Sequence, residues 1–305
     1  MWSSSSPGRI AARRLLRNPI AVLSSIFVVA MIFCAIFAPF IAPFRYDYED
    51  TSHYTSTPSR PDTRHLLGTD TLGEDVLSRL IYGSRISLTV ATVTIIIECI
   101  IGLPLGLAAG FYGGFIDTAL MRITDAMFAF PDILLAILLR AVIAPPSGQP
   151  LPAYINLGTL FFALGMVGWP PLARLVRGQA LSLRGKEYVD AARLAGVNDG
   201  TIVVRHLLPN LLGPIVVQIT QDVAGVILAE ATLSFLGLGV QPPFPSWGHM
   251  IYEALPQMQV FPLLMIAPGL LLAAAVLTFN FLGDALRDAL DPRTSTLQTG
   301  GRKTK

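Results

Sequence analysis

The sequence predicts an all-α polytopic membrane protein with six transmembrane helices and a cytoplasmic loop between helices four and five. Of its 305 residues, 52% are hydrophobic and 14% are charged, whereas soluble domains carry about 25% charged residues. Residues 19–44, 141–173 and 254–283 contain no charged side chain. Each of these ranges exceeds the roughly 20 residues that cross about 30 Å of hydrocarbon. Composition and spacing together therefore indicate several membrane spans.

Six apolar segments are expected to cross the membrane, at 20–42, 86–110, 118–143, 153–175, 209–237 and 261–283. The third is the least apolar, because it contains Arg122, Asp125, Asp132 and Arg140, and a proline-rich turn at 145–152 ends it. Strand alternation typical of a barrel is absent from the sequence. Helices are then the structure that satisfies the backbone groups in lipid.

The distribution of basic residues predicts the orientation. With six spans, 16 of the 22 Lys and Arg residues fall on the side of the two termini, and that side is cytoplasmic by the positive-inside rule. The predicted layout is a cytoplasmic segment 1–19, an extracytoplasmic loop 43–85, a core 86–283 with an inner loop 176–208, and a cytoplasmic tail 284–305. The chain is thus expected to lie in the cytoplasmic membrane with both termini inside.

Several functional classes lack support in the sequence. The net charge is +2, and no basic stripe with interleaved aromatics indicates nucleic-acid binding. Cys34 and Cys99 lie in apolar segments without metal-ligand spacing. No phosphate-binding loop occurs, since Gly185-Lys186 is followed by Glu187. We therefore expect no catalytic site, no metal site and no cofactor bound by this chain.

The inner loop has the pattern of helix, turn, helix over residues 186–210. Good helix formers from Glu187 to Ala195 stop at Gly196, and Asn198 or Asp199 can cap a second helix. Tyr188, Ala191, Ala192 and Ala195 share one face, and most of these side chains are small. Taken alone, this pattern also fits an amphipathic helix that lies on lipid headgroups.

The spacing of this loop resembles a known signature. Asp190-Ala191-Ala192, three residues, Gly196, nine residues, then His206-x-Leu208-Pro209 resembles the Glu-Ala-Ala-x3-Gly-x9-Ile-x-Leu-Pro loop of ATP-binding-cassette importer permeases. Asp190 replaces Glu and His206 replaces Ile. The resemblance implies coupling helices that dock on an ATPase subunit. The contact and turn residues would be Asp190, Ala191, Ala192, Gly196, Leu208 and Pro209.

Two further stretches narrow the resemblance to C-type permeases for dipeptides, oligopeptides or nickel. The segment 68–88 carries the residues of that pattern, which are Gly68, Thr69, Asp70, Gly73, Asp75 and Arg79. Glu74 stands where the pattern usually has Arg, which puts the role of that position in doubt. Residues 229–239 and 245–248 resemble the fifth span and following loop of the same subfamily.

This resemblance implies a set of partners. They are a second permease subunit that completes a heterodimer, two ATP-binding subunits that hold ATP and Mg, and an extracytoplasmic substrate-binding protein, with membrane lipid around the spans. Short peptides are the expected substrates, and nickel or another small solute is the alternative. An ion-coupled secondary transporter is less favoured, because no convincing internal repeat occurs.

Five acidic residues fall inside expected spans, where a charge is costly. Asp125 and Asp132, together with Arg140, are expected near helix ends. Gln218, Asp222 and Glu230 cover about a third of one helix circumference. With Glu98, these three are candidates for lining a translocation path and accepting hydrogen bonds from a peptide amino terminus. Bonding to neighbouring helices is the equally open alternative.

Overall fold

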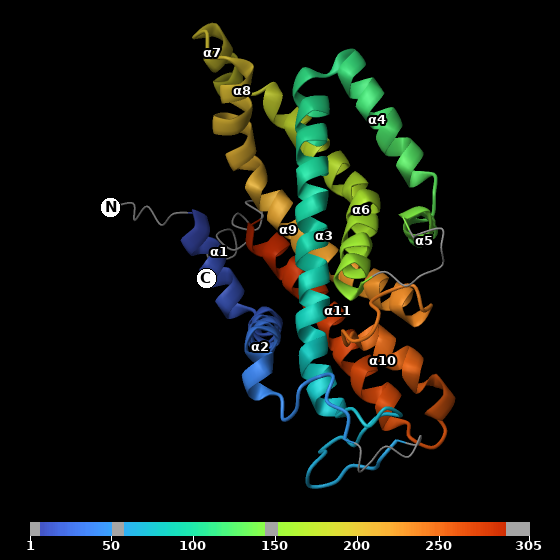
Figure 1. Ribbon diagram of the computed structural model, residues 1–305. Coiled ribbons are helices and arrows are strands. Elements are labelled where there is room, and N and C mark those ends of the chain that lie inside the picture. The colour runs from blue at the N-terminus through green and yellow to red at the C-terminus, as the bar shows by residue number, and fades with distance from the viewer. Residues whose placement is uncertain (1–6, 51–57, 144–151, 291–305) are drawn as a thin grey trace, which may run out of the picture.

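The computed structural model describes residues 7–50, 58–143 and 152–290, and this part of the chain is helical with no named β-strand (Figure 1). Residues 1–6, 51–57, 144–151 and 291–305 lie outside the described residues. The parts of the expected N-terminal segment, outer loop and cytoplasmic tail that fall on them are therefore not described. The elements are α1 (Pro7–Arg17), α2 (Pro19–Ile41), α3 (Val76–Tyr112), α4 (Gly114–Phe128), α5 (Asp132–Ile143), α6 (Ala153–Arg184), α7 (Glu187–Leu194), α8 (Asp199–Ile202), a π-helical turn (Val203–Leu207), α9 (Leu208–Phe235), α10 (Trp247–Ala254), a 3-10 turn (Leu255–Gln257) and α11 (Leu263–Leu290).

Five helical stretches in the described chain are long and apolar enough to cross a membrane: α2, α3, α6, residues 199–235 and α11. The third expected span is instead two helices, because α4 and α5 meet at 89°. Pro131 lies in the break, and a proline disfavours helical geometry at the residue before it. The described residues therefore contain five candidate spans, or six if the bent pair is one, and the third expected segment, 118–143, is this bent pair.

Several helices run past the apolar segments that predicted them. Helix α3 begins at Val76 because the Asp75 side chain caps it, accepting a hydrogen bond from Ser78 N at 2.8 Å. It ends at Gly113, whose φ of +70° lies in the left-handed region. Helix α6 continues to Arg184, nine residues past the predicted end of the fourth span at 175. Where the lipid boundary falls along these helices stays a prediction.

Helices α3 and α6 form the tightest pair in the bundle. A Cβ built on Gly102 would lie 3.0 Å from Trp169 O, one on Gly106 2.5 Å from Ala173 O, and one on Gly110 2.6 Å from the Ala180 Cβ. Glycines spaced by four residues fall on one helix face and let backbones approach closely. This seam fixes α3 against α6 over about two helical turns.

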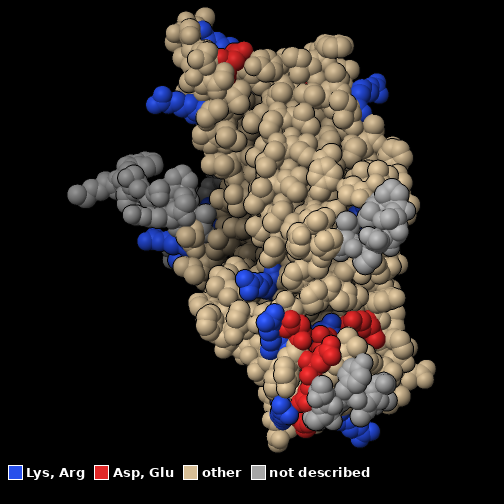
Figure 2. Space-filling view, viewed as in Figure 1, with Lys and Arg blue, Asp and Glu red and all other residues tan. Residues whose placement is uncertain are grey.

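The two loops of the bundle lie at opposite ends. Helices α7 and α8 stand at one end of the molecule, and the loop that precedes α3 lies at the other, beside α10 (Figure 1). Acidic side chains gather at the end with that outer loop, and a broad uncharged surface separates the two ends (Figure 2). Helix α1 contacts the end of α11, where Arg14 Nη1 donates to Ala289 O at 3.3 Å. The two ends of the described chain are therefore close together.

Candidate functional site

The outer loop is organised around one buried cation. Arg79 on α3 is 5% exposed and contacts the carboxylates of Asp70, of Glu74 at 2.6 Å and of Glu253 at 2.8 Å. Burial raises the pKa of Glu74 from its ordinary 4.5 to about 8, although the charge of Arg79 opposes the shift. Glu74, at the position where the resemblance leads us to expect Arg, is thus one of three acids around one cation.

A second buried group holds the same loop against α3. His65 is fully buried, and its Nδ1 lies 2.9 Å from Asp75 Oδ1. Its Nε2 lies 3.4 Å from Asp50 Oδ2. Gly68 and Gly73 have φ of +81° and +78°, and a Cβ on Gly68 would lie 2.3 Å from Ser59 O. Side chains other than glycine are excluded there, which gives a structural reason for two of the signature glycines.

Helix α10 ties this loop to the bundle. His249 Nε2 lies 3.2 Å from Glu253 Oε1. Burial acts to raise the pKa of Glu253, but the hydrogen bond from His249 and the charge of Arg79 lower it overall. Trp247 Nε1 donates to Leu80 O at 3.0 Å, and its ring fills the space that a Cβ on Gly83 would need. Loop, α3 and α10 form one connected unit.

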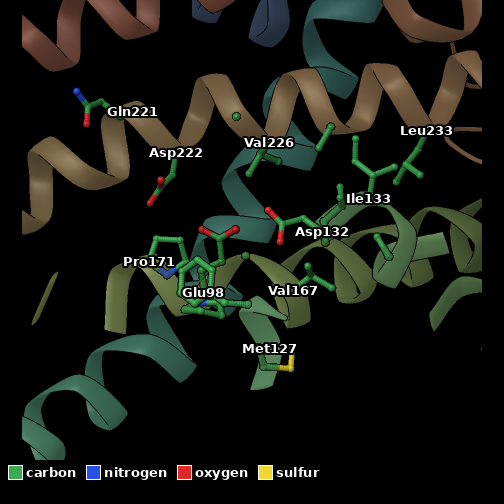
Figure 3. Close-up of a pocket in the computed structure, with 17 residues that line it drawn as sticks. Glu98, Met127, Asp132, Ile133, Val167, Pro171, Gln221, Asp222, Val226 and Leu233 are labelled. Atoms are coloured by element: carbon green, nitrogen blue, oxygen red, sulfur yellow. The ribbon is translucent and has the colours of Figure 1, made fainter. Parts of the chain in front are cut away.

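A cavity of about 250 Å³, partly open at the surface, lies between α3, the bent pair α4 and α5, α6 and α9. The carboxylates of Glu98, Asp132 and Asp222 point into it from three different helices (Figure 3). Its remaining lining is mostly apolar, and no Lys, Arg or His is among the residues that line it. The interior of this cavity is therefore acidic.

Glu98 is the most enclosed of the three acids. It is 3% exposed and makes no hydrogen bond or ion pair within the described part of the chain. A Cβ on Gly168 would lie 2.0 Å from Glu98 Oε1, so glycine at this position of α6 makes room for the carboxylate. Asp222 accepts a hydrogen bond from Gln218 Nε2 at 2.8 Å, one turn earlier on α9.

The structure regroups the acids that the sequence singled out. Glu98 and Asp222 line the cavity, and Gln218 contacts Asp222 without lining it. Glu230 does not line the cavity; it is fully buried and accepts from Ser234 Oγ at 2.6 Å. Asp132 was expected near a helix end, and it is the first residue of α5, yet the break in the third span places that end at the cavity.

Two of the other charges of the third segment, Asp125 and Arg140, have protein partners. Asp125 Oδ1 lies 2.6 Å from Arg174 Nη2, and the guanidinium of Arg174 lies 3.9 Å from the centre of the Phe128 ring. Arg140 donates to Gly239 O at 3.0 Å and to Asn156 Oδ1 at 2.9 Å. These contacts join α4 to α6, and α5 to the end of α9 and the start of α6.

The inner loop packs one face on the bundle and leaves the other free. Val189, Ile202 and Leu207 are fully buried in an apolar cluster with the ends of α3, α6 and α9. On α7, the residues Tyr188, Asp190, Ala191 and Ala195 remain exposed, and Ala192 is half-buried. Gly196 has φ of +74° and ends α7, with Val197 N donating to Ala192 O at 3.1 Å. Leu208 and Pro209 begin α9.

Sequence reasoning missed Asp132 as a cavity residue and overlooked the glycines that shape the site. The signal for the seam was present, since Gly102, Gly106 and Gly110 follow the four-residue spacing typical of close helix pairs. No comparable signal marks Gly168, whose role depends on which residue of α3 lies opposite.

Comparisons with known proteins agree with this geometry. The family model described as "Binding-protein-dependent transport system inner membrane component" matches residues 102–296, and that of the N-terminal TM domain of oligopeptide transport permease C matches residues 6–59. The chain is 42% identical over 288 residues to the glutathione transport system permease protein GsiD of Pectobacterium atrosepticum, covering 94% of this chain and 92% of the relative. It is 39% identical over 292 residues to the dipeptide transport system permease protein DppC of Alkalihalophilus pseudofirmus, covering 96% and 92%.

A solved structure shares the fold. A chain from the inward-facing MetNI methionine ABC transporter aligns with a TM-score of 0.54 at 21% identity, over 70% of this chain and 96% of that chain.

Proposed function

The chain belongs to the family of binding-protein-dependent transport system inner membrane components, and on that premise we propose that it moves short peptides across the cytoplasmic membrane. As a family member it is a multi-pass membrane permease subunit of an ATP-binding-cassette importer and not an enzyme. Its relatives are named for transport of a dipeptide and of glutathione. These names favour peptidic solutes of two or three residues as the substrates of this chain.

The observation that carries this proposal is the acidic cavity between helices that continue into the inner loop. Helix α6 runs without interruption from Gly168 at the cavity to Arg184 at the loop, and α9 runs back from Leu208 to Asp222. A helix rises 1.5 Å per residue, so each connection is about 20 to 25 Å long. A displacement of α7 would therefore reach the cavity through two helices.

The energy for transport comes from partner chains in this proposal. Two ATP-binding subunits hold ATP and Mg and dock on the exposed face of α7, with Asp190, Ala191 and Ala192 as contacts and Gly196, Leu208 and Pro209 setting the turn. A second permease subunit completes a heterodimer, and an extracytoplasmic binding protein delivers the peptide to the outer loop. Both termini and the inner loop then face the cytoplasm. The 16 of 22 Lys and Arg residues on the side of the termini support this orientation, and α7 and α8 lie at the end of the bundle away from the outer loop.

In this proposal the path through the chain includes Glu98 and Asp222, with Gln218 holding one oxygen of Asp222, and Asp132 joins them because it lines the same cavity. Nickel is the second candidate substrate. It is less favoured because no group of three metal-ligating side chains occurs in the described ranges 7–50, 58–143 and 152–290.

Two measurements test the proposal. In proteoliposomes that contain the whole transporter, Ala191→Trp should abolish ATP-dependent uptake of a labelled dipeptide, because it blocks the docking face, while the small substitution Ala191→Ser should retain it. In intact cells, a membrane-impermeant maleimide should label Asp47→Cys, and should label Ala195→Cys only after permeabilisation. Uptake by Ala191→Trp at the normal rate would contradict the coupling role, and labelling of both cysteines from outside would contradict the orientation.

A further inference from the structure

We propose that the cavity is an ammonium subsite, in which Glu98 and Asp222 accept hydrogen bonds from the free amino terminus of the transported peptide. This inference rests on the proposed transport function and identifies which end of the peptide this chain binds.

The lining has one sign of charge. Glu98, Asp132 and Asp222 contribute carboxylates from α3, α5 and α9, and no cationic side chain lines the cavity. Inside a low-dielectric bundle, such a lining attracts a cation and repels the carboxylate end of a peptide. The acidic end of the substrate is thus excluded from this cavity.

Glu98 is aimed into this space without a partner. The side chain is 3% exposed, points into the cavity (Figure 3) and has no hydrogen bond or ion pair in the described part of the chain. A buried acid without a partner is costly to ionise, and a cation that enters the cavity supplies the partner that stabilises its carboxylate. Gly168 keeps this arrangement open, because any Cβ there would overlap Glu98 Oε1.

Asp222 supplies the second acceptor. Gln218 Nε2 binds its Oδ1 at 2.8 Å and leaves Oδ2 free. A primary ammonium group has three N–H donors, so it can serve both carboxylates and retain one donor for water or a carbonyl. Asp132, across the cavity, adds negative potential.

The volume of the cavity and the side chains that line it favour one end of an organic molecule over a metal ion as the ligand. The cavity of about 250 Å³ is smaller than the roughly 300–1,000 Å³ of pockets that enclose whole small ligands. It fits an amino terminus with its first residue. A hard divalent cation requires about six oxygen ligands, and no metal-holding group of three such side chains exists in the described residues.

A protection assay on the nucleotide-free complex in nanodiscs tests this subsite directly. Ala229, a half-buried cavity residue, is replaced by Cys as a reporter in a background in which Cys34 and Cys99 are replaced by Ala. The probes are alaninamide, which carries an ammonium, and N-acetylalaninamide, which is neutral; neither has a carboxylate. We expect alaninamide to slow maleimide alkylation at least threefold at saturation and N-acetylalaninamide to leave the rate unchanged.

Variants then assign the effect to residues. Glu98→Gln and Asp222→Asn should each weaken alaninamide protection by about tenfold or more, the loss expected for a charge-assisted hydrogen bond. Gly168→Ala should have a similar effect without removing a charge, because it displaces Glu98. Glu230→Gln, on the same helix as Asp222 but outside the cavity, should leave protection as it was.

Equal protection by both probes, or protection by neither, would overturn the ammonium subsite. If Glu230→Gln lost as much alaninamide protection as Glu98→Gln and Asp222→Asn, the assignment of the ammonium subsite to this cavity would be overturned. The outcome is separable from the proposed function, because dipeptide uptake by the unsubstituted transporter in proteoliposomes is measured in parallel. Peptide uptake without amine-selective protection would contradict the ammonium subsite and leave the transport proposal intact. The absence of ATP-dependent peptide uptake would contradict the transport proposal.

Discussion

The seam between α3 and α6 predicts that adding one methyl group near the C-terminal end of α3 destabilises the protein. A Cβ on Gly106 lies 2.5 Å from Ala173 O, 2.8 Å from Val176 Cβ and 3.0 Å from Val176 Cγ1. For ordinary contact at 3.4 Å, α6 must retreat by about 0.9 Å. Neither neighbour is the end of a flexible side chain, so the two helices must separate. Overpacking of this kind costs about 1–3 kcal/mol.

The matched control is Gly178→Ala on α6, where a Cβ meets nothing within 4 Å. Because glycine is the poorer helix former, this change should stabilise the helix by up to about 1 kcal/mol. The assay is the temperature at which half of the detergent-solubilised complex leaves its monodisperse chromatographic peak. Each kcal/mol corresponds to about 2–4 °C for domains of 150–250 residues. Gly106→Ala should therefore melt several degrees lower and Gly178→Ala no lower than the parent. Equal melting temperatures of the two variants would refute the claim that close packing at Gly106 holds α3 against α6.

Three further predictions concern the loops. Arg79→Gln leaves three carboxylates without their cation and should cost about 3–5 kcal/mol of the local stability of the outer loop, measured as faster proteolysis of the segment before α3. Gly196→Ala forces a left-handed φ of +74° on alanine and should cost about 1–2 kcal/mol, seen as faster proteolysis of the inner loop, whereas Gly200→Ala in α8 should not. The pKa of Glu74 is raised from 4.5 to about 8, so the folded loop binds a proton more tightly than the unfolded chain does. The stability of the loop should therefore fall as the pH rises from 5 to 8. The variant Glu74→Gln should remove this pH dependence in the same proteolysis assay.

Much of the fold followed from the sequence because hydrophobic length and polar spacing act locally. The segment 20–42 became α2 with little change of bounds, since a proline at its start and an uncharged run define it. The inner loop also matched its pattern of helix, Gly196, helix. Helix lengths were less predictable, because α3 and α6 continue into more polar sequence, where tertiary contacts support them: Trp247 donates to Leu80 on α3, and Val176 and Ala180 of α6 lie in an apolar cluster.

The outer loop shows a different limit. Its signature residues were recognisable, but their roles depend on residues far along the chain, since Arg79 contacts Glu253 and Trp247 contacts Leu80. Residues separated by about 170 positions leave no periodic signal in one sequence. The positive φ of Gly68 and Gly73 gives those two signature positions a physical reason that spacing alone could not supply.

The acidic cavity shows why membrane acids can be found in a sequence but not grouped. Each carboxylate is conspicuous by itself, because an ionisable group in an apolar segment is costly. Their grouping depends on the 89° break between α4 and α5, which turns Asp132 to the cavity, and on Gly168, which admits the Glu98 carboxylate. Glu230 satisfies the same sequence criterion as Asp222, yet its neighbour Ser234 holds it in a buried contact outside the cavity. The spacing of Asp222 and Glu230 on one helix therefore gives no sign of which acid faces the cavity, because that depends on the neighbouring side chains, which leave Asp222 at the cavity and hold Glu230 against Ser234.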